Sequence, residues 1–140
     1  REPLWRHLIN YRCGTGHSVS FVGNVHEGPH ALNGRNTTLM RPGMIVTDEP
    51  GVYETDLVGI RIENELVCVH KADNQYGTFL GFEPIMFVPI ATSPIVPGVL
   101  TKDELDWLNN YHRQVFEKLA PRLNDEEREW LAKKCAAIGC

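Results

Sequence analysis

The longest run of β-forming residues in this chain, Val58–Val69, most constrains its fold. Ile60 and Leu66 give the run the apolar content of a buried strand, yet Glu63 places a carboxylate in its middle. Burying an isolated carboxylate is costly unless it is paired with a cation or bound to a metal. The fold must therefore supply a positive partner for Glu63, and Arg61, predicted on the same strand face, is one such partner.

Other β-type segments surround this run. Met44 opens a strand predicted to end near Glu49, and Phe79–Ile90 forms another, in which two prolines indicate an edge strand or an irregular course. His17–Val25 carries apolar residues at period two, which predicts an extended segment. Together these segments predict an antiparallel, β-rich unit over residues 14–90.

Helices are predicted at both ends of the chain. Pro3 suits the last turns of a helix packed on a core. Thr101 and Glu104 form a capping box that begins a long helix, which Pro121 ends, and Asn124 caps a second helix. The second helix is assigned an apolar face of Leu131, Cys135 and Ile138 and a stop at Gly139. The predicted fold class is therefore α+β.

Composition excludes several classes of partner. The formal net charge of −4 gives no electrostatic reason to bind nucleic acid or a membrane surface. No apolar run is long enough to span a bilayer. No cysteine pair has C-x-x-C spacing, so we expect reduced thiols in a cytoplasmic protein. The cysteines are Cys13, Cys68, Cys135 and Cys140.

Four polar residues lie on predicted strands or at their ends, among apolar or glycine neighbours: His17, His26, Glu49 and Glu63. Taken singly, each acid is readily explained as structural, for example by an ion pair between Arg61 and Glu63. Taken together, imidazole and carboxylate groups are typical of a site for a hard or borderline divalent metal.

The order of these residues resembles that of a known family, the Xaa-Pro aminopeptidases (aminopeptidase P) of the pita-bread metallopeptidases, family M24. Prolidase and methionine aminopeptidase are relatives. The tail, including Trp107–His112, resembles the extension of the longer aminopeptidase P proteins. The matching segments are Gly14-Thr15-Gly16-His17, Asn24-Val25-His26-Glu27-Gly28-Pro29, Thr47-Asp48-Glu49-Pro50-Gly51-Val52-Tyr53 and Gly59-Ile60-Arg61-Ile62-Glu63-Asn64.

The resemblance implies a fold and a division of the chain. It implies the C-terminal half of a pita-bread (creatinase/aminopeptidase-like) fold, with an antiparallel sheet and flanking helices. Residues 1–91 would form the C-terminal part of the catalytic domain, and residues 92–140 a helical extension.

The resemblance also implies roles for the metal ligands. His17 and Glu49 match ligands of one metal, and Glu63 matches the carboxylate that bridges two metals. Glu49 also matches a residue that helps to take a proton from the attacking water. The implied cofactors are two divalent ions, expected to be Mn²⁺, with Co²⁺ or Zn²⁺ as alternatives.

Three further residues match positions beside the metals. His26 matches a histidine that binds no metal but contacts the substrate and the developing tetrahedral intermediate. Arg61 and Tyr53 match residues that orient the metal ligands. The implied reaction is metal-assisted hydrolysis of the bond between an N-terminal residue and proline. The implied partners are peptides with proline in second position, and the implied assembly is a homodimer.

The chain departs from the family pattern in ways that limit the prediction. Two aspartate ligands that the family needs upstream of the histidine motif are not found, so we expect this piece alone to bind metal weakly and to be inactive. Cys13 replaces a histidine near the substrate pocket, and Ser18 and Ser20 replace glycines. Two alternatives stay open: a prolidase-type dipeptidase, and a pita-bread pseudo-enzyme that binds peptides or proteins.

The remaining histidines and tryptophans receive plainer interpretations. We expect His7, His70 and His112 at the surface, and His30 is a weaker candidate for the mouth of the substrate pocket. The tryptophans, which we expect in the core or between helices, are Trp5, Trp107 and Trp130.

Overall fold

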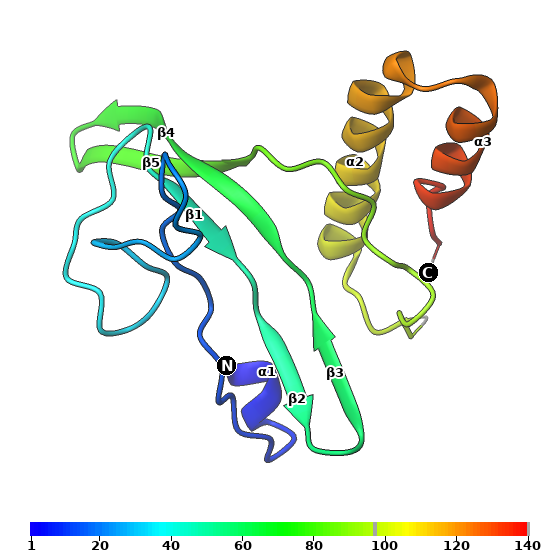
Figure 1. The fold of residues 1–140 in the computed structure, drawn as a ribbon. Coiled ribbons are helices and arrows are strands. Elements are labelled where there is room, and N and C mark those ends of the chain that lie inside the picture. The colour runs from blue at the N-terminus through cyan, green and yellow to red at the C-terminus, as the bar shows by residue number, and fades with distance from the viewer. Residues whose placement is uncertain (97, 140) are drawn as a thin grey trace. The chain divides into compact units, whose positions relative to one another are not determined.

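A computed structural model describes residues 1–96 and 98–139 (Figure 1). The chain divides into two compact units, Arg1–Met86 and a second that begins at Phe87. Antiparallel strands make up most of the regular structure of the first unit, and helices that of the second. The predicted α+β class is confirmed. The boundary at residue 91 stays a prediction, as does the role given to each part.

The first unit holds five strands in two antiparallel sheets: β1 (Ile45–Asp48), β2 (Gly51–Glu54), β3 (Val58–Arg61), β4 (Asn64–Asn74) and β5 (Gly77–Pro84). One sheet has the order β1-β4-β5, and the other pairs β2 with β3. Asp48 pairs with Asn64 at the end of the first sheet, and Gly51 pairs with Arg61 at the start of the second. The two sheets therefore follow one another along a single antiparallel ribbon, and the pairing is interrupted between them on both sides of that ribbon.

The prediction of one continuous strand over Val58–Val69 is wrong, because this break interrupts it. Its pairing stops after Arg61 and resumes at Asn64. Pro50 lies on the opposite side of the break and has no N–H to donate to a strand pairing. In the part of the chain that the structure describes, the one backbone hydrogen bond across the break runs from the amide of Ile62 to the carbonyl of Pro50, at 3.4 Å. The interruption places Glu49 and Glu63 opposite one another, freed from regular pairing.

The prediction of an extended segment over His17–Val25 is wrong beyond its first residues. His17 and Ser18 form isolated bridges, to Ala31 and Val46, and no regular strand follows. Phe21 is fully exposed. A period-two pattern makes a strand only when a neighbouring strand accepts its hydrogen bonds, and among the described residues none pairs with residues 19–25.

The helix expected at the start is also shorter and less buried than predicted. Helix α1 (Glu2–Trp5) has Pro3 in its first turn, as expected, but it contains no buried residue. Trp5 and Leu8 are exposed. The first unit as a whole has few buried apolar side chains, chiefly Val46 and Cys68.

The second unit follows its capping signals closely. Helix α2 (Lys102–Leu119) and helix α3 (Asp125–Lys134) each begin with a complete capping box, and the short helix η1 (Ala120–Arg122) lies between them. The core consists of Tyr111, Val115 and Leu131, against which pack Phe87, Ile90, Phe116, Leu119, Leu123 and Cys135.

The end of α3 differs from the prediction. The helix stops at Lys134, so Ile138 and Gly139 are not part of it. Instead, the side-chain amide of Asn109 exchanges two 3.0 Å hydrogen bonds with the backbone of Ile138. Trp5, Trp107 and Trp130 are all more than half exposed, so none of them is a core residue. Among the described residues, no helix has the length and apolarity to cross a bilayer.

Candidate functional site

A cavity of about 350 Å³ opens in the first unit, beside the break in the ribbon. Most of its lining residues were singled out from the sequence. They come from the 13–17 segment, from the ends of β1 and β3, from β2 and from the loop around His26. The lining comprises Cys13, Gly14, Gly16, His17, His26, Glu49, Tyr53 and Arg61.

Backbone hydrogen bonds hold the histidine segment beside the end of β1. The amide of Thr47 donates to the carbonyl of His17 at 2.9 Å, and the amide of Glu49 donates to that of Thr15 at 2.7 Å. Only glycine fits at position 16, because a Cβ there would lie 1.9 Å from the carbonyl oxygen of Thr47. This close approach brings the side chains of His17 and Glu49 together.

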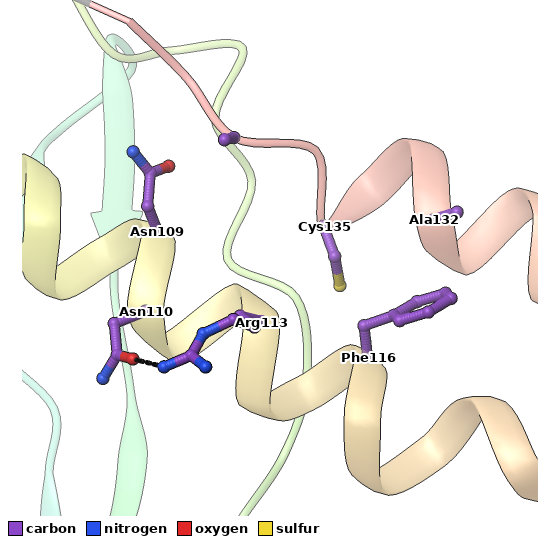
Figure 2. A pocket seen from close by; sticks show the side chains of 7 residues that line it. Asn109, Asn110, Arg113, Phe116, Ala132 and Cys135 are labelled. Carbon is purple, nitrogen blue, oxygen red and sulfur yellow. Dashed lines mark hydrogen bonds between the residues drawn. The ribbon is translucent and has the colours of Figure 1, made fainter.

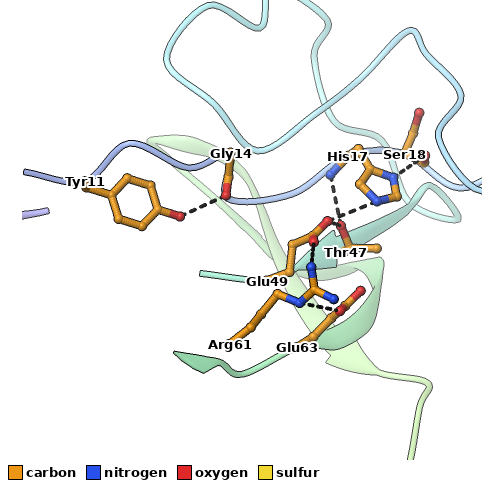
Figure 3. Close-up of polar contacts among 8 residues, drawn as sticks. All are labelled: Tyr11, Gly14, His17, Ser18, Thr47, Glu49, Arg61 and Glu63. Carbon is orange, nitrogen blue, oxygen red and sulfur yellow. Dashed lines mark hydrogen bonds and ion pairs between the residues drawn. The ribbon is translucent and has the colours of Figure 1, made fainter. Parts of the chain in front are cut away.

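The imidazole of His17 faces the carboxylate of Glu49 (Figure 3). Its Nδ1 lies 2.9 Å from the carbonyl oxygen of Ser18, which can only accept, so Nδ1 carries a proton. The Nε2 atom lies 3.0 Å from Glu49 Oε1. In a neutral ring this nitrogen is an acceptor as well, and two acceptors at that distance require a proton or a cation shared between them. This pair of atoms therefore fits either a metal ion bound by both or a protonated His17.

Arg61 joins the two candidate carboxylate ligands. Its Nη1 lies 3.5 Å from Glu49 Oε2 and its Nε lies 3.3 Å from Glu63 Oε2. One guanidinium balances one of the two carboxylate charges, so the group keeps a net negative charge with a neutral His17. Arg61 and Glu63 do form the ion pair that the sequence allowed.

The three candidate ligands are not all gathered around one point. His17 and Glu49 are in contact with each other. Glu63 instead pairs with the guanidinium of Arg61, which in turn pairs with Glu49. Over residues 1–96 and 98–139, no group of three or more His, Cys, Asp or Glu side chains is arranged to hold a metal ion. The assignment of all three as metal ligands stays a prediction.

His26, Tyr53 and Cys13 line the same cavity. The ring centroid of His26 lies 3.9 Å from that of His17, so the two imidazoles stack with a tilt. Tyr53 is held where glycines leave room for its ring, because a Cβ on Gly51 would come within 2.7 Å of it. The expected place of Cys13 near the pocket agrees with its position in the lining.

Thr47 opens one of the segments that match the family, but no role in the site was predicted for it. Its hydroxyl accepts from the amide of His17 at 3.0 Å and donates to Glu49 Oε1 at 2.8 Å. The residue is buried, with 2% of its surface exposed. Its position in β1, two residues before Glu49, was the available signal, because side chains two apart in an extended chain point to the same side.

The predicted surface position of His112 is wrong. His112 is completely buried in the second unit, where its Nε2 accepts a 3.0 Å hydrogen bond from the amide of Ile90. Burial lowers the pKa of its imidazole. His30 is not among the residues that line the cavity, and its Nε2 donates to the carbonyl of Ile45 at 2.7 Å. His70 is exposed, as expected, and its Nε2 lies 2.8 Å from Asp73 Oδ2.

A larger cavity, of about 510 Å³, lies in the second unit between α2 and the residues from α3 onward (Figure 2). Phe116, Ala132 and Cys135 give it an apolar surface, and burial raises the pKa of the Cys135 thiol. Arg113, also in the lining, contacts Asn110 through a hydrogen bond and Glu117 through an ion pair. A raised pKa leaves less of this thiol as the reactive thiolate. Cys13, Cys68 and Cys135 are free thiols, and Cys140 lies outside the described residues.

Comparison with known proteins matches both parts of the chain. The profile of metallopeptidase family M24 matches residues 1–70, and that of the C-terminal region of peptidase M24 matches residues 78–138. Among curated proteins, aminopeptidase P2 of Arabidopsis thaliana is 46% identical over 94% of this chain and 19% of its own length. Aminopeptidase P1 of Lotus japonicus is 43% identical over 99% of this chain and 22% of its own.

A solved structure agrees with these matches. The X-prolyl aminopeptidase of Caenorhabditis elegans, described as a cytosolic enzyme with a di-nuclear active site, superposes with a TM-score of 0.85 at 37% identity. The match covers 99% of this chain and 23% of that one. The chain thus spans about a fifth of the length of the curated relatives it matches. The pita-bread type of fold is confirmed, and the chain belongs to metallopeptidase family M24, in which it resembles the C-terminal part of the Xaa-Pro aminopeptidases.

Proposed function

We propose that this chain supplies part of the active site of a dinuclear-metal aminopeptidase that hydrolyses the bond between an N-terminal residue and proline. The observation that carries the proposal is the pair of facing acceptors, His17 Nε2 and Glu49 Oε1, at 3.0 Å. The names and descriptions of the relatives supply the substrate class and the number of metals.

The donor set fits one half of such a centre better than the whole. His17 and Glu49 would hold one cation, and Glu63 would join them once its pairing with Arg61 is rearranged. Two divalent cations need more donors than these three residues offer. We therefore propose that further ligands come from polypeptide outside these 140 residues, and that the 140 residues alone bind metal weakly and are inactive.

The bound cations would supply Lewis-acid polarisation of the scissile carbonyl and of the attacking water. Glu49 Oε2 is not engaged with Thr47 or His17, but it lies 3.5 Å from Arg61 Nη1, so it could take a proton from the attacking water only once that ion pair is loosened. His26 lines the cavity beside His17 and would hydrogen-bond the substrate oxygen as charge develops on it. Arg61 and Tyr53 would hold the carboxylates and the cavity wall in place.

The finer properties of the enzyme belong to the same proposal. The proposed cations are Mn²⁺, which the family resemblance implies, with Co²⁺ and Zn²⁺ as alternatives. The proposed substrates are peptides with proline in second position, the proposed assembly is a homodimer, and the proposed compartment is the cytosol, as described for the C. elegans neighbour.

The test is hydrolysis of Arg-Pro-Pro by the full-length protein that carries this chain, with and without Mn²⁺. We expect release of the N-terminal arginine that chelation abolishes and that Glu49→Gln lowers by at least about 100-fold. Cleavage of Arg-Pro but not of Arg-Pro-Pro would indicate a prolidase instead. Peptide binding without hydrolysis at any metal concentration would indicate a pseudo-enzyme and refute the proposal.

A further inference from the structure

We propose that the Thr47 hydroxyl is a positioning group that sets the distance between the two candidate ligands, His17 and Glu49. The inference rests on the proposed function, because it concerns the metal affinity of that same site. Thr47 does not line the cavity, so it acts through its neighbours and not on the substrate.

The hydroxyl links the two ligand-bearing segments in one direction. The amide of His17 donates to Thr47 Oγ1 at 3.0 Å, which occupies an acceptor position of the hydroxyl. The hydroxyl proton is then free to go to Glu49 Oε1, at 2.8 Å. This is the same carboxylate oxygen that lies 3.0 Å from His17 Nε2. One hydroxyl thus fixes the backbone of one ligand and the side-chain rotation of the other (Figure 3).

Burial makes this link hard to replace. Thr47 is 2% exposed and Ser18 beside it is equally buried, so solvent has little access to the hydroxyl. Removing the hydroxyl would leave the His17 amide without its partner and Glu49 Oε1 without a donor. The carboxylate would then be free to rotate toward Arg61, whose Nη1 already lies 3.5 Å from its other oxygen.

The guanidinium and the cation compete for the same carboxylate. Arg61 is always present in the site. A metal ion therefore binds Glu49 only if its interaction with the carboxylate is more favourable than that of the guanidinium. A donor that holds Oε1 toward His17 favours the metal-binding arrangement before any metal arrives. Thr47 is therefore expected to control metal affinity more than the stability of the fold.

The experiment measures Mn²⁺ binding by calorimetry in the full-length protein and in three variants. Thr47→Val keeps the shape and removes the hydroxyl. We expect it to lower Mn²⁺ affinity by roughly 10- to 100-fold, the usual effect of removing a group that orients a metal ligand. Thr47→Ser keeps the hydroxyl and should stay within about threefold of the wild type.

Thr78→Val is the matched control. It removes a hydroxyl that also donates to a carboxylate, Asp73 Oδ1 at 2.7 Å, but at the exposed end of the hairpin, where Asp73 of β4 pairs with Thr78 of β5. We expect unchanged Mn²⁺ affinity. Thermal unfolding of each metal-free variant separates affinity from stability, because a purely structural role would move the unfolding temperature and leave the affinity of the folded protein unchanged.

The outcomes distinguish this inference from the function it rests on. A wild-type protein that binds no Mn²⁺ overturns the proposed function, and the role of Thr47 with it. A wild-type protein that binds Mn²⁺ while Thr47→Val binds equally well overturns the positioning role alone. If valine prevents folding, Thr47→Ala makes the same comparison. If both unfold while Thr47→Ser does not, the hydroxyl serves the fold and the positioning role is refuted.

Discussion

The two units of this chain are held together in different ways. The second unit has a continuous apolar core around Tyr111, Val115 and Leu131 and two complete capping boxes. The first unit buries few large apolar side chains and exposes many. It places hydroxyls, those of Ser18 and Thr47, among its few buried residues.

This difference shows what each unit uses to fix its geometry. In the second unit, apolar packing and local helix signals agree, so its structure depends little on any one polar contact. In the first, hydrogen bonds and one close glycine contact position the candidate ligands. The precision of the site should therefore depend on a few identifiable atoms, whereas the stability of the second unit should depend on buried volume.

The largest effect is expected at Gly16 in the first unit. Gly16→Ala would place a Cβ 1.9 Å from the backbone oxygen of Thr47, so the strand or the histidine segment must move, at a cost of about 4 kcal/mol. Gly14→Ala is the control, since a Cβ at that position would meet no atom within 4 Å. Urea unfolding of both variants measures the difference, and equal destabilisation would contradict the close contact.

A core truncation tests the second unit. Leu131 is 2% exposed, so Leu131→Ala should cost about 3 kcal/mol in unfolding free energy. Ile60, on β3 of the first unit, is 52% exposed, and Ile60→Ala should cost about 1 kcal/mol or less. Amide hydrogen exchange, measured separately for each unit, reports both changes. Similar costs at the two positions would remove the contrast between a packed unit and a hydrogen-bonded one.

The pH dependence of the second unit depends on His112, its one histidine in the sequence. Burial lowers the pKa of this imidazole, so between the folded pKa and the unfolded value of about 6.5 the unfolded chain binds more protons. Stability should thus be constant above about pH 7. It should fall as the pH drops below about 6.5, by at most about 1.4 kcal/mol per pH unit.

His112→Gln is the matched test of that slope, because glutamine can still accept a hydrogen bond but does not titrate. Hydrogen exchange of α2 amides between pH 7.5 and 5.5 should lose much of its pH-dependent destabilisation in the variant. A variant with the same pH profile as the wild type would assign the slope to other groups.

The smallest effect is expected at a helix cap. Thr101 accepts from the amide of Glu104, whose side chain bonds back to Thr101. Thr101→Ala should cost about 1 kcal/mol, and Thr101→Ser much less. Thermal unfolding followed by circular dichroism at a helix-sensitive wavelength measures both. Loss of α2 in the alanine variant would mean that the core contributes less than the structure indicates.

Local signals predicted the second unit well, because they act within a few residues of themselves. Thr101 and Asn124 begin their helices where the sequence placed them, and Pro121 ends the first. The apolar face through Ile138 failed, since the helix ends at Lys134 and the side chain of Asn109 binds the following backbone. Asn109 is distant from Ile138 in sequence, and no local pattern around Ile138 predicts this contact.

In the first unit, the residue types of the candidate site could be predicted, and their exact arrangement could not. The chemistry of imidazole and carboxylate groups among apolar neighbours singled out His17, His26, Glu49 and Glu63. Whether they meet depends on the register that sets Asp48 opposite Asn64 and on the contact between Gly16 and Thr47. Both are long-range relations, which a period-two pattern cannot specify.

The sequence by itself determined the α+β class, the starts of α2 and α3 and the set of polar residues, because propensity, capping and side-chain chemistry are local properties. Only the tertiary structure decided that the Val58–Val69 run breaks opposite Pro50, that Arg61 stands between two carboxylates, and that His112 is buried. These outcomes depend on which distant backbone supplies each hydrogen-bond partner and each van der Waals contact, and that choice is made by the folded chain as a whole.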